Sequence, residues 1–354
     1  MDHSSLEALG WDSWFEEQAR LRCDPASAVA RVAAVDRDQL LLLDDTGAFR
    51  AKLSGTLMYE AASPPELPCV GDWVCVEKSQ ADQFGLVRGV LDRKTRLRRK
   101  AAGESVEYQM IAANVDFVII VQSCHYDFNL KRLERYLVVV RDGGAAPYVL
   151  LTKIDLVGHA VLAAQLDQIR RAGVTAPVLT LSNVTREGVD ELKAVLSPGK
   201  TYCFVGSSGV GKSTIINGLV GRDVLETKAV SGTGEGRHTT VRRELIVLEG
   251  GAMVVDNPGT RELGVLVAEG AIDASYGDIM ALSSQCRFGD CTHTNEPGCA
   301  VLRGLEIGGI DAEHYANFLK LRSESEHHQM SYAEKRKRDK DFRGSKRSGK
   351  RDPE

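Results

Sequence analysis

Residues 200–220 read KTYCFVGSSGVGKSTIINGLV, and this stretch decides the fold around it. An apolar segment runs into GSSGVGKS at 206–213, which fits the phosphate-loop pattern G-x-x-x-x-G-K-[ST], and a helix-forming segment follows. The glycines let backbone N–H groups point at phosphates, while the lysine supplies charge and the serine hydroxyl reaches Mg²⁺. The stretch predicts a nucleoside triphosphate site made by Gly206, Ser207, Ser208, Gly209, Val210, Gly211, Lys212, Ser213 and Thr214.

A second phosphate-side motif lies downstream, where Asp256-Asn257-Pro258-Gly259 follows the apolar run AMVV. A D-x-x-G motif in this position is typical of GTPases. We expect Asp256 to hold Mg²⁺ through water and the Gly259 N–H to sense the γ-phosphate. The chain should therefore bind its triphosphate together with Mg²⁺.

The identity of the nucleotide base is indicated by YVLLTKIDLV at 148–157, where an apolar strand runs into Thr152-Lys153-Ile154-Asp155. A buried carboxylate at Asp155 can accept two hydrogen bonds from guanine, which adenine cannot supply, so ATP would leave it unpaired. Lys153 would lie along the base, and Thr152 stands where Asn is commoner. TLSN at 180–183 resembles a second guanine-contacting loop with Ser182 aligned, so these residues predict GTP as the nucleotide.

The order of these motifs is unusual, because the base motif precedes the phosphate loop by about 50 residues. All the motifs of a GTPase are present, but the base motif stands before the phosphate loop in the chain instead of after it. Circular permutation preserves a packed sheet when the old termini lie close together. We therefore expect a circularly permuted α/β P-loop GTPase domain.

A cluster of metal-binding residue types occupies CRFGDCTHTNEPGC at 286–299. Cys286, Cys291, His293 and Cys299 offer three thiolates and an imidazole, which is the ligand set of a tetrahedral Cys₃His zinc site. Four protein ligands close the site, so we expect one structural Zn²⁺ per chain that holds a small helical domain together.

The other five cysteines (Cys23, Cys69, Cys75, Cys124 and Cys203) are predicted to be buried, reduced thiols. The first residues carry acids rather than early Lys or Arg, which does not resemble a secretory signal. Apolar runs such as FVIIV at 117–121 are too short for a membrane span of about 20 residues. These observations favour a soluble, cytoplasmic protein without a membrane partner.

The domain organisation follows from changes in pattern along the chain. Five short strand-like segments between 28 and 92 predict an all-β barrel of the OB type. Longer strands alternate with helices from 106 to 264, which is typical of a parallel α/β sheet. We expect the following division: 1–25 a helical extension, 26–100 the barrel, 101–265 the GTPase domain, 266–330 a helical zinc domain, and 331–354 a basic, disordered tail.

The net charge of −4 is unevenly distributed. Residues 331–354 carry ten Lys or Arg against five acidic residues, a charge of +5, so the remainder carries −9. A basic tail on an acidic body favours contact with a polyanion. The basic segment DRKTRLRRK at 92–100 is either a solvated linker or a nucleic-acid contact, and the sequence does not separate the two.

Taken together, these motifs closely resemble the family of ribosome small-subunit-dependent GTPase A. The resemblance covers nearly the whole chain and includes PCVGDWVCVE, FNLKRLERYL, TKIDL, GSSGVGKSTIINGL, GRHTT, DNPGTREL and CRFGDCTHTNEPGCAV. It implies GTP hydrolysis stimulated by the small ribosomal subunit during its late maturation, with ribosomal RNA contacted by the barrel and the zinc domain. Nothing in the sequence suggests a dimer, so we expect a monomer.

The residue that follows the D-x-x-G glycine is Thr260, where many GTPases have the Gln that orients the attacking water. We therefore expect slow turnover in the isolated protein. His238 lies in GTGEGRHTT at 232–240, resembles the histidine of the family's HTT motif and offers an imidazole to orient the water. Thr239 or Thr240 should complete the Mg²⁺ shell, and Thr240 is preferred.

Two rival interpretations remain open on the sequence alone. In the first, TKID is a coincidence and the chain is a P-loop ATPase or kinase, which competition between ATP and GTP decides. In the second, an RNA-binding module uses GTP as a structural ligand without hydrolysing it. Thr260 is compatible with the second interpretation, whereas Lys212, Ser213 and Asp256 argue against it.

Overall fold

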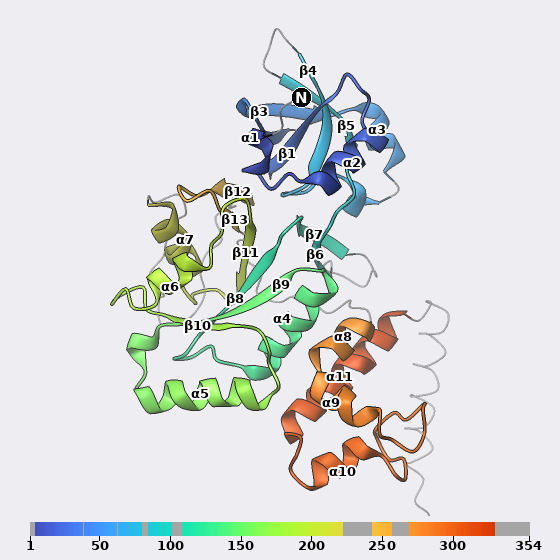
Figure 1. The fold of residues 1–354 in the computed structure, drawn as a ribbon, viewed down its shortest axis with the longest axis vertical. Coiled ribbons are helices and arrows are strands. Elements are labelled where there is room, and N and C mark those ends of the chain that lie inside the picture. Colours follow the sequence, from blue (N-terminus) through green and yellow to red (C-terminus); the bar gives the residue numbers. More distant parts are fainter. Residues whose placement is uncertain are drawn as a thin grey trace, which may run out of the picture.

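The structure is a computed structural model in which residues 4–37, 39–61, 63–79, 84–100, 108–221, 243–256 and 269–329 are described. Figure 1 shows three parts: a β-barrel at the top, an α/β unit in the middle and a group of helices below it. None of the helices in the described ranges is long and apolar enough to cross a membrane.

The N-terminal part is a five-stranded barrel, as the sequence predicts. Its strand order is β1-β2-β3-β5-β4, and β4 pairs back with β1 to close it. The closure leaves no free barrel edge, and one apolar cluster that includes Val32, Leu42 and Val76 fills the interior. The strands are β1 (Ala28–Val35), β2 (Leu40–Asp44), β3 (Gly47–Leu53), β4 (Trp73–Lys78) and β5 (Phe84–Val90), with helix α3 (Gly55–Glu60) and the 3₁₀ turn η1 (Pro64–Glu66) between β3 and β4.

Two helices precede the barrel, α1 (Ser4–Glu7) and α2 (Ser13–Arg22). Asp12 caps α2 by accepting hydrogen bonds from the N–H groups of Trp14 and Phe15. The rings of Trp11 and Phe15 pack on Trp73 of β4, with centroids 4.7 and 5.9 Å away. This aromatic contact fixes the N-terminal helices against the barrel.

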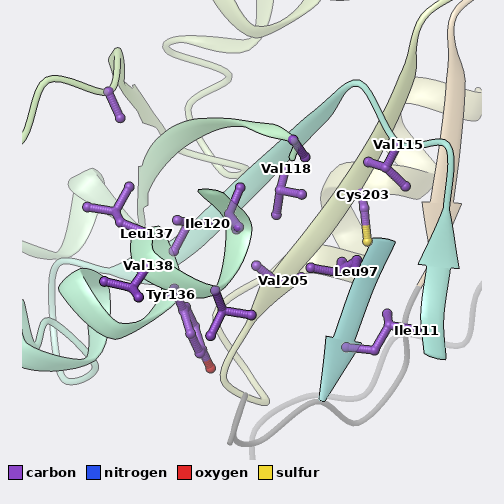
Figure 2. Packing of buried hydrophobic residues seen from close by; sticks show 14 of the residues in the cluster. Leu97, Ile111, Val115, Val118, Ile120, Tyr136, Leu137, Val138, Cys203 and Val205 are labelled. Atoms are coloured by element: carbon purple, nitrogen blue, oxygen red, sulfur yellow. The ribbon is translucent and has the colours of Figure 1, made fainter. Parts of the chain in front are cut away.

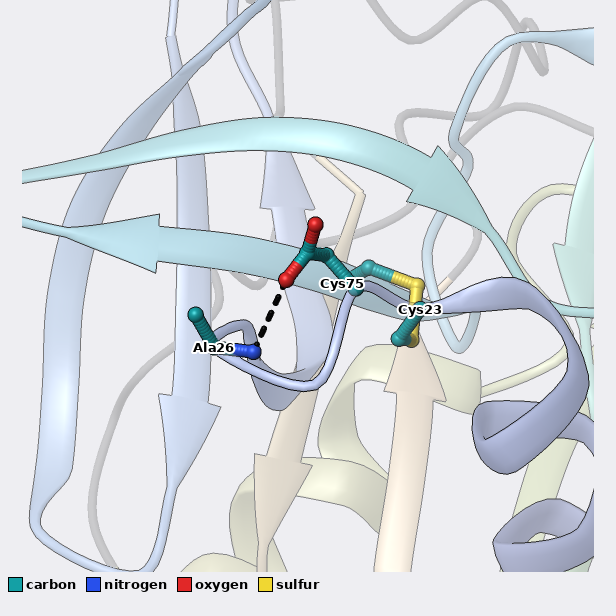
Figure 3. The surroundings of a disulfide bond; sticks show 4 residues. Cys23, Ala26 and Cys75 are labelled. Atoms are coloured by element: carbon teal, nitrogen blue, oxygen red, sulfur yellow. Dashed lines mark hydrogen bonds between the residues drawn. A yellow bond between two sulfur atoms is a disulfide. The ribbon is translucent and has the colours of Figure 1, made fainter.

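The structure also corrects one prediction, because Cys23 and Cys75 form a disulfide rather than two reduced thiols. Figure 3 shows the bond between the end of α2 and strand β4, beside a turn in which Asp24 accepts a hydrogen bond from the N–H of Ala26. The two cysteines are 52 residues apart, so only the fold brings them together. The remaining cysteines of the earlier group, Cys69, Cys124 and Cys203, are free thiols.

The basic segment at 92–100 is neither a solvated linker nor a bare cationic surface. Arg93 makes two hydrogen bonds to Asp72, a fully buried carboxylate, and Arg98 pairs with Asp142 at 2.9 Å. Strand β6 (Arg96–Lys100) pairs antiparallel with β7 (Tyr108–Ala113) in a separate two-stranded sheet. Arg93 thus fastens this segment to the barrel, and Arg98 fastens it to α4 of the α/β unit.

The α/β unit is built on a sheet with the order β10-β9-β8-β11-β13-β12. All neighbours are parallel except β12 and β13, which form an antiparallel hairpin. The strands are β8 (Phe117–Ser123), β9 (Ala146–Thr152), β10 (Val178–Leu181), β11 (Thr201–Gly206), β12 (Glu244–Val247) and β13 (Met253–Asp256). A single bridge from Ala34 to Glu244 continues this sheet into the barrel.

Helices cover both faces of this sheet, which is why its central strands β8 and β11 are mostly apolar and are buried along nearly their whole length. Val118 and Ile120 of β8 belong to one cluster with Tyr136 and Leu137 of α4, and Figure 2 shows Leu97 of β6 in the same cluster. Ile119 and Val121 face the other way, towards α6 and α7. The helices are α4 (Leu130–Asp142), α5 (His159–Arg171), α6 (Val189–Ala194) and α7 (Lys212–Val220), and the 3₁₀ turn η2 (Ile154–Leu156) follows β9.

The C-terminal part is helical, as expected, and packs on α4 of the α/β unit. Its helices are α8 (Glu269–Ser275), α9 (Gly277–Ser283), α10 (Ala300–Glu306) and α11 (Ala312–Gln329). His314 of α11 contacts Glu134 of α4 at 2.5 Å and Asp278 of α9 at 3.2 Å, and both Asn317 and Tyr276 reach Glu134. A buried polar network thus joins these helices to α4. The domain boundaries given from the sequence stay a prediction.

Candidate nucleotide site and metal-binding cluster

The phosphate-loop motif lies at the carboxyl end of β11, between this strand and α7. Its glycines adopt positive φ, with 147° at Gly206, 79° at Gly209 and 101° at Gly211. A Cβ atom at Gly206 would come within 2.2 Å of the Val121 carbonyl oxygen, so this position admits only glycine. The loop therefore takes the wrapped conformation for which its glycines were predicted.

Lys212 begins α7 and folds back over the loop. Its Nζ donates hydrogen bonds to the carbonyl oxygens of Gly206 and Ser207 at 2.8 and 2.7 Å. Burial lowers the pKa of Lys212 to about 8, although the carboxylates of Asp256 and Asp127 oppose the change. A bound anion would favour the charged amine, so the ammonium is placed to exchange these carbonyls for phosphate oxygens.

The other predicted phosphate-side residues lie around the same loop. Val210 is buried, Ser207 and Ser213 are half-buried, and Ser208 and Thr214 are exposed. Asp256 is buried at the end of β13, the strand next to β11. Gly259, His238 and Thr240 lie outside the described residues, as do Thr239 and Thr260.

The base motif lies at the end of β9 and is fastened to the phosphate loop. The Thr152 hydroxyl is fully buried and donates to the Val210 carbonyl oxygen at 2.7 Å, with the Gln122 carbonyl oxygen at 3.2 Å. Residues 58 apart in the chain are thereby joined. The structure brings the two motifs together in spite of their reversed order.

Ser182 follows β10 and orients Asp155. Its hydroxyl donates to the Asp155 carboxylate at 2.5 Å and accepts from the N–H groups of Val184 and Thr185 at 3.1 and 3.0 Å. One carboxylate oxygen is thus fixed, and the Asp155 side chain is exposed rather than buried as the sequence argument assumed. Water exclusion at Asp155 would have to come from the bound base itself.

A residue that the sequence analysis missed lies between the two motifs. Tyr126, in the loop after β8, donates a hydrogen bond to the Gly209 carbonyl oxygen at 2.9 Å. It accepts one from Lys153 Nζ at 2.6 Å, and the Lys153 ammonium also lies 4.5 Å from the centre of its ring. No motif points to this tyrosine; its only signal in the sequence is its place after a buried parallel strand.

Cys286, Cys291, His293 and Cys299 form a metal-binding group, with all four ligand atoms within 4.8 Å of one another. The Sγ atoms of Cys286 and Cys299 are 3.8 Å apart. His293 Nδ1 lies 3.6 Å from the first sulfur and 3.5 Å from the second. The structure therefore gathers all four residues that the sequence predicted as ligands.

The surroundings of this group hold its ligands in place. The Ser283 hydroxyl contacts Nε2 of His293 at 3.0 Å, which turns Nδ1 towards the sulfurs. The N–H groups of Ala300 and Leu302, in the first turn of α10, donate to the sulfurs of Cys286 and Cys299. Donors aimed at sulfur stabilise thiolates, which are the form that binds metal.

Comparison with known proteins adds independent support. A model of the RsgA GTPase family matches residues 90–266. Among curated proteins, the chain is 42% identical over 316 residues to "Small ribosomal subunit biogenesis GTPase RsgA 2" of Lactiplantibacillus plantarum, with 89% of this chain and 87% of the relative covered. It is 41% identical over 330 residues to "Small ribosomal subunit biogenesis GTPase RsgA" of Opitutus terrae, with 90% and 89% covered.

Solved structures with the same fold include YjeQ from Thermotoga maritima. The TM-score is 0.65 at 25% sequence identity, over 84% of this chain and 98% of the other. YloQ, described as a circularly permuted GTPase, gives a TM-score of 0.62 at 22% identity over 86% and 97% of the two chains, a likeness of fold alone.

Proposed function

The chain belongs to the RsgA GTPase family, and on this premise we propose that it hydrolyses GTP in the late maturation of the small ribosomal subunit and is stimulated by binding that subunit. The observation that carries the proposal is the Thr152–Val210 hydrogen bond. It joins the base motif to the phosphate loop, and the curated relatives are named small ribosomal subunit biogenesis GTPases.

The nucleotide is held in this proposal by two groups of residues. Asp155, oriented by Ser182, accepts hydrogen bonds from the guanine edge, and Lys153 lies along the base. The phosphates are bound by the loop Gly206, Ser207, Ser208, Gly209, Val210, Gly211, Lys212, Ser213 and Thr214, and Gly259 senses the γ-phosphate. Thr152 couples the two groups.

Mg²⁺ would be held by Ser213, Thr240 and Asp256 together with phosphate oxygens. It would neutralise charge on the β- and γ-phosphates. Buried Asp256 at the end of β13 and half-buried Ser213 at the start of α7 come from neighbouring elements, which suits them to one ion. Thr240 is proposed from its place in the sequence.

Catalysis is assigned to Lys212, His238 and Thr240. Lys212 stabilises charge on the transferred phosphate, and His238 orients the attacking water where Thr260 replaces the usual glutamine. We propose that RNA binding brings His238 to the γ-phosphate.

The Cys₃His group is proposed to hold one structural Zn²⁺ per chain. A tetrahedral zinc ion with ordinary bond lengths separates two sulfurs by about 3.8 Å and a sulfur from a nitrogen by about 3.5 Å. The distances of 3.8, 3.6 and 3.5 Å fit this geometry, and the fourth residue closes the set. Zinc would hold the loop between α9 and α10 in its folded form.

Ribosomal RNA is the proposed polyanion, contacted by the barrel and the zinc domain and aided by the basic residues 331–354. The protein would act in the cytoplasm as a monomer. We propose the domain division 26–100, 101–265 and 266–330, which keeps each RNA-contacting part beside the GTPase domain.

The test is GTP turnover with and without purified small ribosomal subunits, at two salt concentrations and with ATP as control. We expect slow turnover alone and stimulation of about 10³-fold or more that is specific to GTP and weaker at high salt. Turnover of ATP would favour the ATPase interpretation. GTP binding without stimulated turnover would favour an RNA-binding module that uses GTP structurally.

His238→Ala tests the catalytic assignment. Because His238 is assigned to the water and not to the nucleotide, GTP affinity should stay within about twofold while stimulated turnover falls by about 10²-fold or more. His159→Ala, at the exposed start of α5, is the matched control and should retain stimulated turnover. A large loss of GTP affinity in His238→Ala would contradict the assignment.

A further inference from the structure

The loop between β8 and α4 reaches the nucleotide site from a third strand. In the sheet, β8 lies between β9, which carries the base motif, and β11, which carries the phosphate loop. The carboxyl ends of these parallel strands meet at one edge, so the loop that leaves β8 must pass between the two motifs. Tyr126 is the residue of this loop that contacts both.

Two hydrogen bonds converge on one hydroxyl group. The Tyr126 hydroxyl donates its hydrogen to Gly209 O at 2.9 Å, so its lone pairs are left to accept from Lys153 Nζ at 2.6 Å. The second bond involves a charged donor and is therefore the stronger of the two. Removal of the hydroxyl breaks both contacts at once.

Both partners of Tyr126 have a left-handed backbone conformation. Lys153 has a left-handed conformation with φ 59°, and Gly209 is an exposed glycine with φ 79°. Among the described residues, the Tyr126 hydroxyl is the hydrogen-bond partner of the Lys153 ammonium. The side chain of Lys153 and the Gly209 carbonyl of the phosphate loop are therefore held by the same hydroxyl group.

We infer that Tyr126 is a positioning residue for guanine nucleotides: its hydroxyl, oriented by the bond to the Gly209 carbonyl, holds Lys153 in the arrangement that retains bound nucleotide. The inference rests on the proposed GTP site. The Thr152–Val210 bond ties the strands together deep in the site, whereas Tyr126 ties them at the surface, where its ring is half exposed.

The test is the dissociation rate of a fluorescent GDP analogue from Tyr126→Phe, compared with the unchanged protein. Phe keeps the ring beside the Lys153 ammonium and removes only the hydroxyl, so dissociation should accelerate about fivefold to tenfold. The melting temperature of the nucleotide-free protein and the single-turnover rate at saturating GTP should not change. Tyr59→Phe, at a tyrosine 89% exposed on α3, is the matched control and should match the unchanged protein.

A second variant separates positioning from a general loosening of the loop. If Tyr126 acts through Lys153, then Lys153→Met and the double variant Lys153→Met/Tyr126→Phe should release the analogue at rates within about twofold of each other. Rates that multiply in the double variant would overturn the inference, as would an unchanged rate in Tyr126→Phe. If the unchanged protein binds no guanine nucleotide, the proposed function itself fails, which is a different result.

Discussion

At the scale of single residues, base recognition depends on how Asp155 is held. Its carboxylate is exposed, yet one oxygen is fixed by Ser182, whose hydroxyl is in turn fixed by two backbone N–H groups. A carboxylate that is already oriented loses less conformational freedom when guanine binds. Ser182 therefore contributes to affinity without needing to touch the base.

Ser182→Ala should weaken GDP binding by about tenfold, because it removes a hydrogen bond to a charged group and leaves the N–H groups of Val184 and Thr185 without their acceptor. Titration calorimetry measures the change. Ser284→Ala removes an exposed hydroxyl from the end of α9 and serves as the control. Equal affinities in the two variants would show that the Ser182–Asp155 contact does not support binding.

The sequence predicted best the residues that belong to motifs confined to a short stretch of the chain. The phosphate loop and the Cys₃His group each span fewer than 15 residues, so spacing alone identifies them. Tyr126 could not be found in this way, because its role depends on two strands that approach only in the folded sheet. His238 and Thr240 lie outside the described residues, so their roles stay predictions.

At the scale of elements, α4 is the part of the α/β unit that meets the C-terminal helices. Glu134 of α4 is buried and accepts from Asn317 at 2.5 Å and from Tyr276 at 3.3 Å, while His314 lies on its other oxygen. A buried carboxylate is costly unless it is paired. The positive charge of His314 is therefore needed to keep this interface closed.

The interface should weaken as the pH rises. Burial lowers the pKa of His314, but hydrogen bonds and charge from Asp278 and Glu134 outweigh it and raise that pKa to about 9, from an ordinary value of 6.5. The folded state thus holds the proton more tightly than the unfolded state. The stabilisation, about 3 kcal/mol, is complete below about pH 6.5 and is lost as the pH rises through about 9.

Urea unfolding between pH 6 and 10 measures this loss, with His314→Gln as the control. The variant should be less stable than the unchanged protein below pH 7 and should approach it above pH 9. Other groups that titrate in this range, such as Lys212 with its pKa of about 8, are shared by both proteins and cancel in the difference. A difference that does not vary with pH would mean that His314 is neutral in the fold.

Metal removal should act on one element of the structure only. The segment from 286 to 299 contains no helix or strand and crosses between α9 and α10, so a bound metal would add support to the hydrogen bonds that Glu296 accepts from its backbone. A chelator should make residues 275–310 sensitive to limited proteolysis while GDP affinity stays within about twofold. Restored resistance on addition of Zn²⁺ is the control, and a parallel loss of GDP binding would contradict the separation of the two sites.

At the scale of the whole molecule, the sequence predicted the five barrel strands, the permuted sheet and the C-terminal helices. Each follows from periodicity and turn residues that are local in the chain. It did not predict how the parts are joined, because the Arg93–Asp72 pair and the Cys23–Cys75 bond connect residues 21 and 52 positions apart. Such contacts follow only from the three-dimensional arrangement.

The disulfide should be detectable in two ways: by the number of reactive thiols, and by a loss of stability when it is reduced. In denaturant without reductant and with a chelator present, the protein should show six reactive thiols of its eight cysteines. Reduction should lower the free energy of unfolding of the barrel by about 2–4 kcal/mol. The free energy of unfolding of the Cys23→Ser variant should not change when reductant is added. A count of eight thiols in freshly purified protein would contradict the Cys23–Cys75 bond.

The rotated order of the GTPase motifs also affects how the protein is made. Strands β8, β9 and β10 leave the translating ribosome first and form one side of the sheet, whereas β11, β13 and β12 complete the other side. At ordinary rates of synthesis the nascent base-recognition half waits roughly 4–15 seconds for the last strand. Strand β11 ends 25 residues after β10, so the apolar edge of β8 has no partner for roughly the first 1–5 seconds of that interval. This factor is therefore most prone to aggregation while it is itself being translated.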